Sequence, residues 1–321
     1  MTSTLRLSDG RQIRWHDYGA SPENSDPHTV LALHGTPGSY LKYKPVDAAA
    51  RDCGLHILAV DRWGYGGTDA PGRWPSARAK TQSGEMAELS LHQFARDIEA
   101  LMRHRGIARY SVVGISGGGP YAAAVASANA GAVAKLALVA PVGIIRREET
   151  VLLSAFHWFC FRGIARIPTA TRAVFAGYRV LHALSPKLAI AAAMTRSGPA
   201  DRDLLGRPEI VGHLSRMMRE GLSRSTRGPA IDLKLFAEPW DVDPADIRAP
   251  TRIWFGDQDG SVPRGGIDAL AEVIPTATFV PVTGQGHFWI ATRFPMVLDW
   301  LAGRDEGHGA PIEANSDPRE R

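Results

Sequence analysis

Short apolar runs alternate along this chain with longer stretches in which apolar residues recur at helical spacing. The runs cover residues 29–33, 56–60, 110–115, 133–140 and 251–255. Runs of this length between turn-forming residues are typical of strands that are buried on both faces of a parallel sheet. Because helical stretches separate them, the pattern indicates βαβ units. We therefore predict an α/β fold with a mostly parallel, doubly wound sheet and helices on both of its faces.

The same signals predict the remaining elements. Residues 12–18 alternate in polarity, as in an antiparallel strand with one buried face. A helix begins after Ser90, which forms a capping box with Gln93, and this helix ends at Gly106. A last strand is expected over 276–282, and further helices over 118–130, up to about 273, and over 295–301.

The alternation of strands and helices is interrupted in the second half of the chain. Between about 143 and 239, helical patterns and proline or glycine breakers occur without a strong strand. We therefore predict a sheet-containing core over 1–142 and 240–302, interrupted by a helical insertion over 143–239. Residues 303–321 are polar with few apolar side chains, which indicates a disordered tail.

Composition and charge exclude several classes of protein. The 321 residues are 44% hydrophobic and 22% charged, which is ordinary for a globular chain. The net charge of +4 comes mainly from arginines that are scattered singly or in pairs, so we expect no nucleic-acid partner. The sequence contains no uninterrupted apolar stretch of about twenty residues and no secretory signal. We therefore expect a cytoplasmic protein without a membrane partner.

The cysteines and histidines do not form a metal-binding pattern. Cys53 and Cys160 fit no zinc or redox spacing, and so few cysteines suit a reducing compartment. The spacings H-x-x-x-H and H-E-x-x-H do not occur. We expect no metal and no cofactor, and either a monomer or a homodimer.

The segment with the clearest chemical meaning is Gly114-Ile115-Ser116-Gly117-Gly118, a G-x-S-x-G pattern. It follows a β-branched run and opens an alanine-rich stretch, which is the strand–turn–helix setting that this motif requires. At such a turn the serine takes an unfavourable backbone conformation and is exposed above the sheet, next to a helix N-terminus. A glycine-rich phosphate loop or a plain turn is the alternative. We single out Ser116 as a candidate nucleophile.

Candidate partners for this serine follow later strands. A serine needs a base to act as a nucleophile, and the base needs an acid that orients it. Catalytic groups in such sheets lie beyond the carboxyl ends of the strands. His287 lies in a glycine-rich loop after the last predicted strand, and both Asp257 and Asp259 follow the strand at 251–255. The chain order Ser, Asp, His is the one described for the strand–turn–helix motif.

With these motifs in this order, the chain resembles the α/β-hydrolase family over about residues 12–301. The motifs are His34-Gly35-Thr36-Pro37-Gly38, the segment 61–69, the turn at Ser116, and Gly286-His287. The resemblance implies the α/β-hydrolase fold, with a helical cap inserted in it, and a serine hydrolase that needs no cofactor. It also implies that Asp259 is the acid, because 256–263 aligns with the family's G-x-x-D-x-x-V-P pattern. Asp257 is the alternative.

The resemblance also implies the parts that would stabilise a reacting carbonyl. The backbone N–H groups of Thr36 and Gly117 would form an oxyanion hole. His34 would order its loop by hydrogen bonding rather than act as the base. A serine at position 116 argues against haloalkane dehalogenases and epoxide hydrolases, which resemble this chain but use an aspartate as nucleophile. Acyl chemistry remains.

We expect a carboxylesterase that cleaves a small-to-medium, largely apolar ester, its small-molecule partner, through an acyl-enzyme. A C–C bond hydrolase, a proline-iminopeptidase-type peptidase and a ligand-binding receptor of this fold are the alternatives. Six side chains are candidates for substrate contact: Phe156, Trp158, Phe159, Met217, Phe288 and Trp289. Aromatic residues at helical spacing more often pack in a core than touch a ligand, so ordinary packing is the alternative for each.

Overall fold

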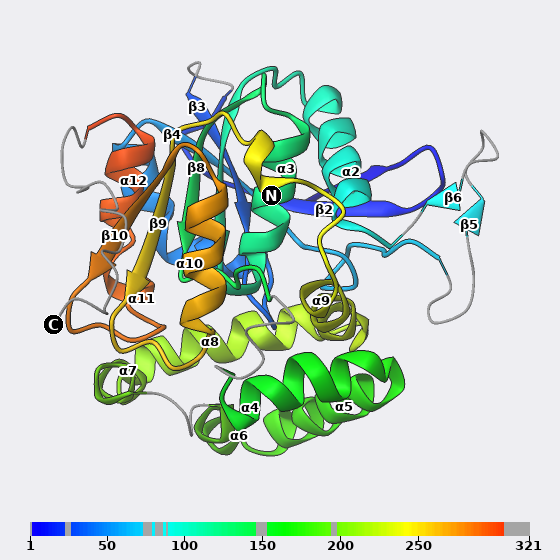
Figure 1. Ribbon diagram of the computed structural model, residues 1–321, viewed down its shortest axis with the longest axis vertical. Coiled ribbons are helices and arrows are strands. Elements are labelled where there is room, and N and C mark those ends of the chain that lie inside the picture. Colours follow the sequence, from blue (N-terminus) through cyan, green and yellow to red (C-terminus); the bar gives the residue numbers. More distant parts are fainter. Residues whose placement is uncertain are drawn as a thin grey trace, which may run out of the picture.

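The computed structural model of the protein describes residues 2–22, 27–72, 79–80, 86–87, 89–145, 153–193 and 198–304. Of the predicted disordered tail, only Gly303 and Arg304 fall within these ranges, and the rest lies outside the described residues. Helices lie on both sides of a central sheet, and a further group of helices lies below it (Figure 1).

The central sheet has eight strands in the order β1-β2-β4-β3-β7-β8-β9-β10. They are β1 (Thr2–Arg6), β2 (Gln12–Gly19), β3 (His28–Leu33), β4 (Leu55–Val60), β7 (Tyr110–Ile115), β8 (Val133–Val139), β9 (Thr251–Gly256) and β10 (Ala277–Val282). Neighbours from β4 to β10 run parallel, whereas β1 and β2 are antiparallel at one edge. This confirms the predicted mostly parallel sheet and its antiparallel strand. Two short strands, β5 (Ala79–Lys80) and β6 (Met86–Ala87), pair separately.

The direction in which strands are added to the sheet reverses next to β3. The chain passes from β3 to β4 on one side, then crosses over to place β7 on the other side of β3. Loops that follow the two strands at such a reversal diverge and leave a crevice at the carboxyl edge of the sheet. The segment 34–38 and the turn at Ser116 follow β3 and β7, so the topology brings them to the same crevice.

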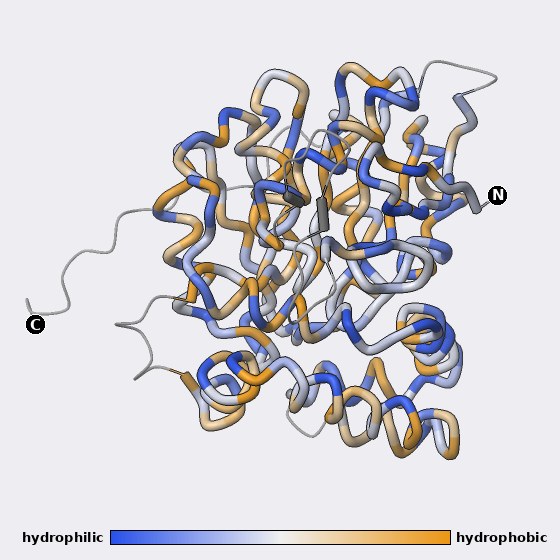
Figure 2. The backbone as a smooth tube through the Cα atoms, turned by 90° about the vertical axis from the view of Figure 1, so that its right-hand side faces the viewer, coloured by the Kyte–Doolittle hydropathy of each residue, from blue (hydrophilic) through white to orange (hydrophobic). Residues whose placement is uncertain are grey.

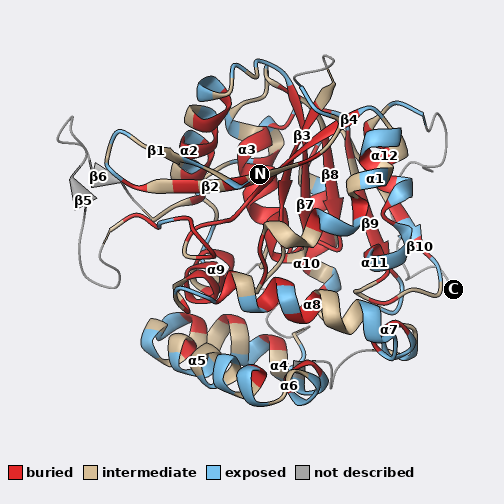
Figure 3. Ribbon diagram, turned by 180° about the vertical axis from the view of Figure 1, so that it is seen from behind, coloured by how far each residue is buried: buried red, intermediate tan, exposed pale blue. Residues whose placement is uncertain are grey.

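Two groups of helices cover the faces of the sheet. One face carries α1 (Asp47–Asp52), α11 (Ile290–Arg293) and α12 (Pro295–Leu301), and the other carries α2 (Leu91–His104), α3 (Gly119–Ala128) and α10 (Arg264–Val273). All residues of β4 and β7 are buried as a result (Figure 3). Burial on both faces explains why these strands are continuous apolar runs in the sequence.

Helix α2 begins at the predicted capping residue. The Ser90 hydroxyl oxygen accepts the backbone N–H of Gln93 at 3.1 Å. The side chain of Gln93 does not complete the predicted capping box, because it donates instead to Oδ1 of Asp97 at 3.0 Å. Asp97 is a buried carboxylate that also accepts from Arg11 and Trp63, so a charged acceptor one turn further on attracts the amide.

Residues 153–193 and 198–239 form helices without a strand, as the sequence indicates. The helices are α4 (Ala155–Trp158), α5 (Pro168–Leu184), α6 (Pro186–Ala193), α7 (Pro199–Leu205), α8 (Pro208–Gly221) and α9 (Arg227–Ala237). We call them the helical layer; they lie beyond the carboxyl edge of the sheet, and Figure 2 shows apolar and hydrophilic residues interleaved along them. The division into core and cap at 143 and 239 stays a prediction. Within the described ranges, no helix is both long and apolar enough to cross a membrane.

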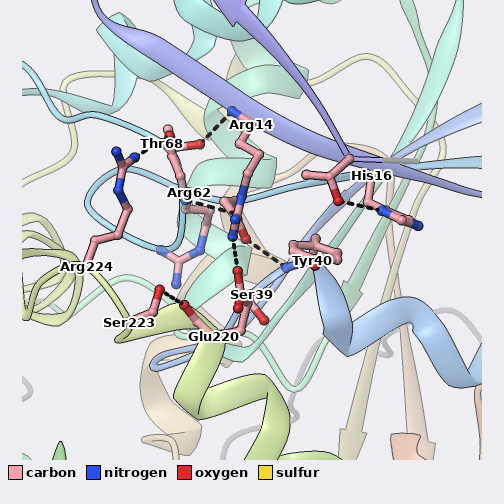
Figure 4. Close-up of polar contacts among 12 residues, drawn as sticks. Arg14, His16, Ser39, Tyr40, Arg62, Thr68, Glu220, Ser223 and Arg224 are labelled. Carbon is pink, nitrogen blue, oxygen red and sulfur yellow. Dashed lines mark hydrogen bonds and ion pairs between the residues drawn. The ribbon is translucent and has the colours of Figure 1, made fainter.

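A polar cluster ties helix α8 to the edge of the sheet (Figure 4). The guanidinium of Arg14 on β2 donates to Asp61 and to Glu220 of α8, each at 2.6 Å. The Ser39 hydroxyl donates to the backbone carbonyl of Met217 at 3.0 Å. These bonds hold α8 against the loop that follows β3, so this helix has a defined position over the crevice.

Candidate active site

Ser116 occupies a tight turn between β7 and α3. Its φ of 52° lies in the left-handed region, which costs a residue with a side chain about 1–2 kcal/mol. A Cβ on Gly114 would lie 2.6 Å from the Cβ of Ala122, and one on Gly118 would lie 2.4 Å from the carbonyl oxygen of Leu33. Glycine is therefore required at both positions, and the strained serine turn predicted from the G-x-S-x-G pattern is present.

The side chains of Ser116, His287 and Asp259 form a continuous hydrogen-bonded chain. Nε2 of His287 lies 3.1 Å from Oγ of Ser116, and Nδ1 lies 2.7 Å from Oδ2 of Asp259. The Asp259 carboxylate is fully buried and the imidazole is 12% exposed. An ionised Asp259 accepts from Nδ1–H, which leaves the lone pair of Nε2 directed at the serine hydroxyl. The three residues therefore have the geometry of a nucleophile, a base and an orienting acid.

Asp257, the alternative acid, has a different position. Its carboxylate oxygens accept the backbone N–H groups of Gly284 and Gln285 at 3.0 and 3.2 Å. These residues immediately precede the loop position of His287. Asp257 therefore supports the backbone of the histidine loop, while Asp259 contacts the ring.

The electrostatic surroundings of His287 favour its protonated form. Burial alone would lower the pKa of the imidazole, but the charge of Asp259 and its hydrogen bond to the ring outweigh that effect. The charge of Asp201 raises the pKa further, and the ammonium of Lys42 lowers it by a smaller amount. The net result is a His287 pKa above its ordinary value of 6.5, as suits a base that must take up a proton from serine.

Asp201 on helix α7 is a positioning residue that the sequence analysis missed. Its two carboxylate oxygens accept the backbone N–H groups of His287 and Phe288, both at 2.8 Å. The residue is fully buried, and a Cβ on Gly286 would lie 2.3 Å from its Cγ. The glycine before the histidine thus makes room for a carboxylate from the helical layer. No local pattern marks Asp201, because its partners are more than eighty residues away in the sequence.

The loop after β3 lies directly against the serine turn. A Cβ on Gly35 would lie 3.2 Å from the Cβ of Ser116, and one on Gly117 would lie 2.1 Å from Oγ1 of Thr36. Gly117 is in the first turn of a helical segment, where backbone N–H groups have no partner within the helix. Among the described residues, no backbone carbonyl accepts from the N–H of Thr36. The two residues predicted for the oxyanion hole are therefore adjacent.

His34 orders this loop, as predicted. Its Nδ1 donates to the carbonyl of Gly35 at 2.8 Å, and its Nε2 accepts the backbone N–H of Arg62 at 3.1 Å. Burial holds the pKa of His34 well below its ordinary value, so the ring is neutral and has one proton to donate. Both ring nitrogens are used by the backbone, which leaves none for a reacting group.

A fully buried ion pair lies beneath the same loop. The guanidinium of Arg62 donates to both oxygens of Asp232 on helix α9, at 2.5 and 2.8 Å. The carboxylate also accepts the hydroxyl groups of Tyr65 and Tyr121 at 2.6 and 2.7 Å, and that of Thr36 at 2.5 Å. Asp232 thereby connects the helical layer to Thr36. The sequence analysis missed Asp232 because it resembles any aspartate on an amphipathic helix.

Replacing Asp232 with alanine is expected to destabilise the fold by about 3–5 kcal/mol, since it leaves a buried guanidinium without its counterion. Urea denaturation monitored by tryptophan fluorescence measures the change. Lys234→Ala on the same helix is the matched control, because its ion pair with Glu238 is partly exposed and contributes less than about 1 kcal/mol. Equal losses in the two variants would contradict the importance of the buried pair.

A cavity of about 390 Å³ opens at Ser116 and His287, between the sheet and the helical layer. Four of the six predicted contact residues line it: Phe156, Phe159, Met217 and Phe288. Further lining residues that the sequence analysis did not single out are Lys42, Cys160, Tyr178, Leu214 and Phe236. The walls are largely apolar, which suits an apolar ligand group.

The expectation that Trp158 and Trp289 also line this cavity is not met. Trp158 is 54% exposed, because it lies two residues after Phe156 and the helical period turns its side chain away. Trp289 is fully buried in the core between the sheet and α12. Its neighbour Phe288 faces the cavity instead.

No group of three or more His, Cys, Asp or Glu side chains in the described part of the chain could hold a metal ion. Cys53 and Cys160 form no disulfide within the part of the chain that the structure describes.

Comparison with known proteins shows the family to which the chain belongs. The model of the alpha/beta hydrolase fold family matches residues 28–293, and no curated protein matches the chain. Similar solved structures include an enol-lactonase from Burkholderia xenovorans LB400, with 18% identity, a TM-score of 0.67 and coverage of 94% of this chain and 99% of that one. The esterase EaEST from Exiguobacterium antarcticum has 17% identity, a TM-score of 0.64 and coverage of 94% and 100%.

A bromoperoxidase from Bacillus anthracis is as similar, with 18% identity, a TM-score of 0.66 and coverage of 94% and 100%. Because the names of these structures differ in activity, the likeness at this level of identity shows the fold alone. The family match extends over most of the chain and includes the serine turn and the histidine loop. The chain belongs to the α/β-hydrolase fold family.

Proposed function

We propose that this protein is a serine hydrolase that cleaves a small-to-medium, largely apolar carboxylic ester through an acyl-enzyme. The observation that carries the proposal is the hydrogen-bonded chain from Ser116 through His287 to Asp259, at 3.1 and 2.7 Å. A strained serine with a base and a buried acid in line is an arrangement suited to nucleophilic acyl transfer.

In the first half of the reaction, Oγ of Ser116 attacks the ester carbonyl while Nε2 of His287 takes the hydroxyl proton. The carbonyl oxygen becomes an oxyanion and accepts from the backbone N–H groups of Thr36 and Gly117. Asp259 stabilises the imidazolium and holds the ring in place. When the tetrahedral adduct collapses, His287 returns the proton to the departing alkoxide, and the acyl group remains on Ser116.

In the second half, water replaces the alcohol. His287 takes a proton from the water, whose oxygen attacks the acyl carbon and forms a second oxyanion in the same N–H pair. The adduct collapses, the proton returns to Oγ of Ser116, and the carboxylic acid leaves. The buried Arg62–Asp232 pair supports this step by fixing Thr36, one of the two donors.

The cavity favours an ester over the amino-terminal substrate of a proline-iminopeptidase-type peptidase. Such a substrate has an ammonium group, and no Asp or Glu is among the described residues that line the cavity. Lys42 is the one Lys or Arg among the described lining residues, and its positive charge would repel an ammonium. We further propose that the helical layer acts as the cap that shapes the acyl or alcohol pocket.

The pH dependence of turnover tests the role of His287. We expect kcat/KM for 4-nitrophenyl butyrate to fall as the pH decreases through a single ionisation above 6.5, because only the neutral imidazole can take the serine proton. Initial rates in constant-ionic-strength buffers from pH 5 to 9, corrected for spontaneous hydrolysis, give the profile. A flat profile over this range, with the fold intact by circular dichroism, would exclude His287 as the base.

A further inference from the structure

Lys42 contributes a cation to the proposed catalytic cavity. It lies on the 3-10 helix Tyr40–Val46, directly after the loop of Thr36, and is half-buried. Among the described residues that line the cavity with Ser116 and His287, it is the one Lys or Arg. The nearby Lys44, in contrast, is exposed and is not among the residues that line the cavity.

The Lys42 ammonium has no counterion among the residues that the structure describes. Within the described ranges, no carboxylate lies within 4 Å of the Lys42 ammonium. The charge of Lys42 disfavours protonation of His213 on α8 and of His287. Burial, followed by the charges of Lys42 and Arg216, lowers the pKa of His213 to about 4, so His213 is neutral at pH 7 and adds no second positive charge beside Lys42.

The lysine nevertheless keeps its charge at neutral pH. Burial lowers the pKa of Lys42 to about 8, which leaves the protonated form in about tenfold excess at pH 7. A charge held among apolar side chains without a partner costs free energy, and a bound anion would relieve that cost. The surroundings thus favour a ligand that brings a negative charge into the cavity.

We propose that Lys42 binds a carboxylate on the substrate, so that the site takes esters or lactones that carry a free carboxylate at a distance from the scissile carbonyl. This inference rests on the proposed function, because it places the ester at Ser116 and the carboxylate at Lys42. A single ammonium matches a single negative charge, which favours a carboxylate over a phosphate dianion. The apolar walls between the two ends suit a hydrocarbon spacer.

Pairs of esters that differ only in whether they carry a free carboxylate test this specificity. The anionic probes are the 4-nitrophenyl monoesters of adipic, pimelic and suberic acids, and the neutral probes are the same molecules with the free acid capped as a methyl ester. For the spacer length that fits the cavity, we expect the kcat/KM of the wild-type protein to be about 10- to 100-fold higher for the anionic ester than for its neutral counterpart. This gain corresponds to one charge-assisted hydrogen bond between the Lys42 ammonium and the carboxylate. Lys42→Met should bring this ratio close to 1, because loss of the ammonium weakens turnover of the anionic ester more than that of the neutral ester.

Lys44→Met is the matched control, because it removes the same charge from an exposed side chain that lies two residues after Lys42. Lys44→Met should keep the wild-type ratio, and Lys42→Arg should keep most of it. A wild-type protein that prefers the neutral ester at all three lengths, or a ratio that survives in Lys42→Met, overturns the carboxylate proposal. Turnover of neither ester by the wild-type protein would instead count against the serine hydrolase itself, so the two failures are distinguishable.

Discussion

Replacing Ser116 with alanine is expected to abolish ester turnover and labelling by a fluorophosphonate probe, while the protein stays folded. Loss of the nucleophile removes the acyl-enzyme route, and kcat in triad hydrolases falls by about 10⁴- to 10⁶-fold on such a change. The alanine side chain fits where the serine stood, and alanine tolerates the strained turn no worse than serine. Release of 4-nitrophenolate and gel-based detection of the fluorescent probe measure both effects.

Ser261→Ala is the matched control for this change, because Ser261 lines the same cavity and contacts Asp259 through its backbone N–H, at 2.8 Å from Oδ1, which alanine retains. Ser261→Ala should keep both turnover and labelling. Labelling that persists in Ser116→Ala, or moves to another residue by peptide mass analysis, would refute the assignment of the nucleophile.

Replacing Asp259 with asparagine is expected to lower kcat by about 10⁴-fold, because the amide no longer holds His287 in the tautomer that can accept the serine proton. Loss of the carboxylate charge also lowers the pKa of His287, so the acidic limb of the residual activity should move to lower pH. Steady-state kinetics and a pH–rate profile on the variant test the two effects together.

Comparison of Asp257→Asn with Asp259→Asn tests which of the two aspartates is the acid that orients His287. Asp257 accepts two backbone N–H groups of the histidine loop, which an amide oxygen can partly replace. Its replacement should therefore cost far less than that of Asp259 and leave the pH profile unchanged. A larger loss in Asp257→Asn than in Asp259→Asn would reverse the assignment of the acid.

The sheet and the serine–histidine–aspartate geometry could be predicted because their determinants are local in the sequence. Strands β4 and β7 are uninterrupted apolar runs, and the turn at Ser116 needs glycines at fixed positions on either side. The chain order of the motifs then places their residues at one edge of a parallel sheet. The choice of Asp259 over Asp257 needed the family pattern, since both follow the same strand.

The supporting residues could not be predicted, because their roles exist only in the folded chain. Asp201, Asp232 and Lys42 resemble surface charges until the helical layer is placed over the crevice. The same holds for Trp158 and Trp289, which were candidates for substrate contact because they are aromatic. The side chain of Trp158 faces solvent, and that of Trp289 lies in the core. Periodicity assigns a residue to an element, whereas the side of the element that meets the cavity depends on tertiary packing.

The two buried aspartates of the helical layer also limit how this layer can be exchanged. Asp201 holds the backbone at His287, and Asp232 holds the hydroxyl of Thr36, so α7 and α9 each complete a different half of the reacting centre. A chimera that receives the corresponding helices of a relative would therefore lose preorganised geometry along with its substrate preference. Transplantation of substrate range onto this scaffold requires that both carboxylates be transferred with it.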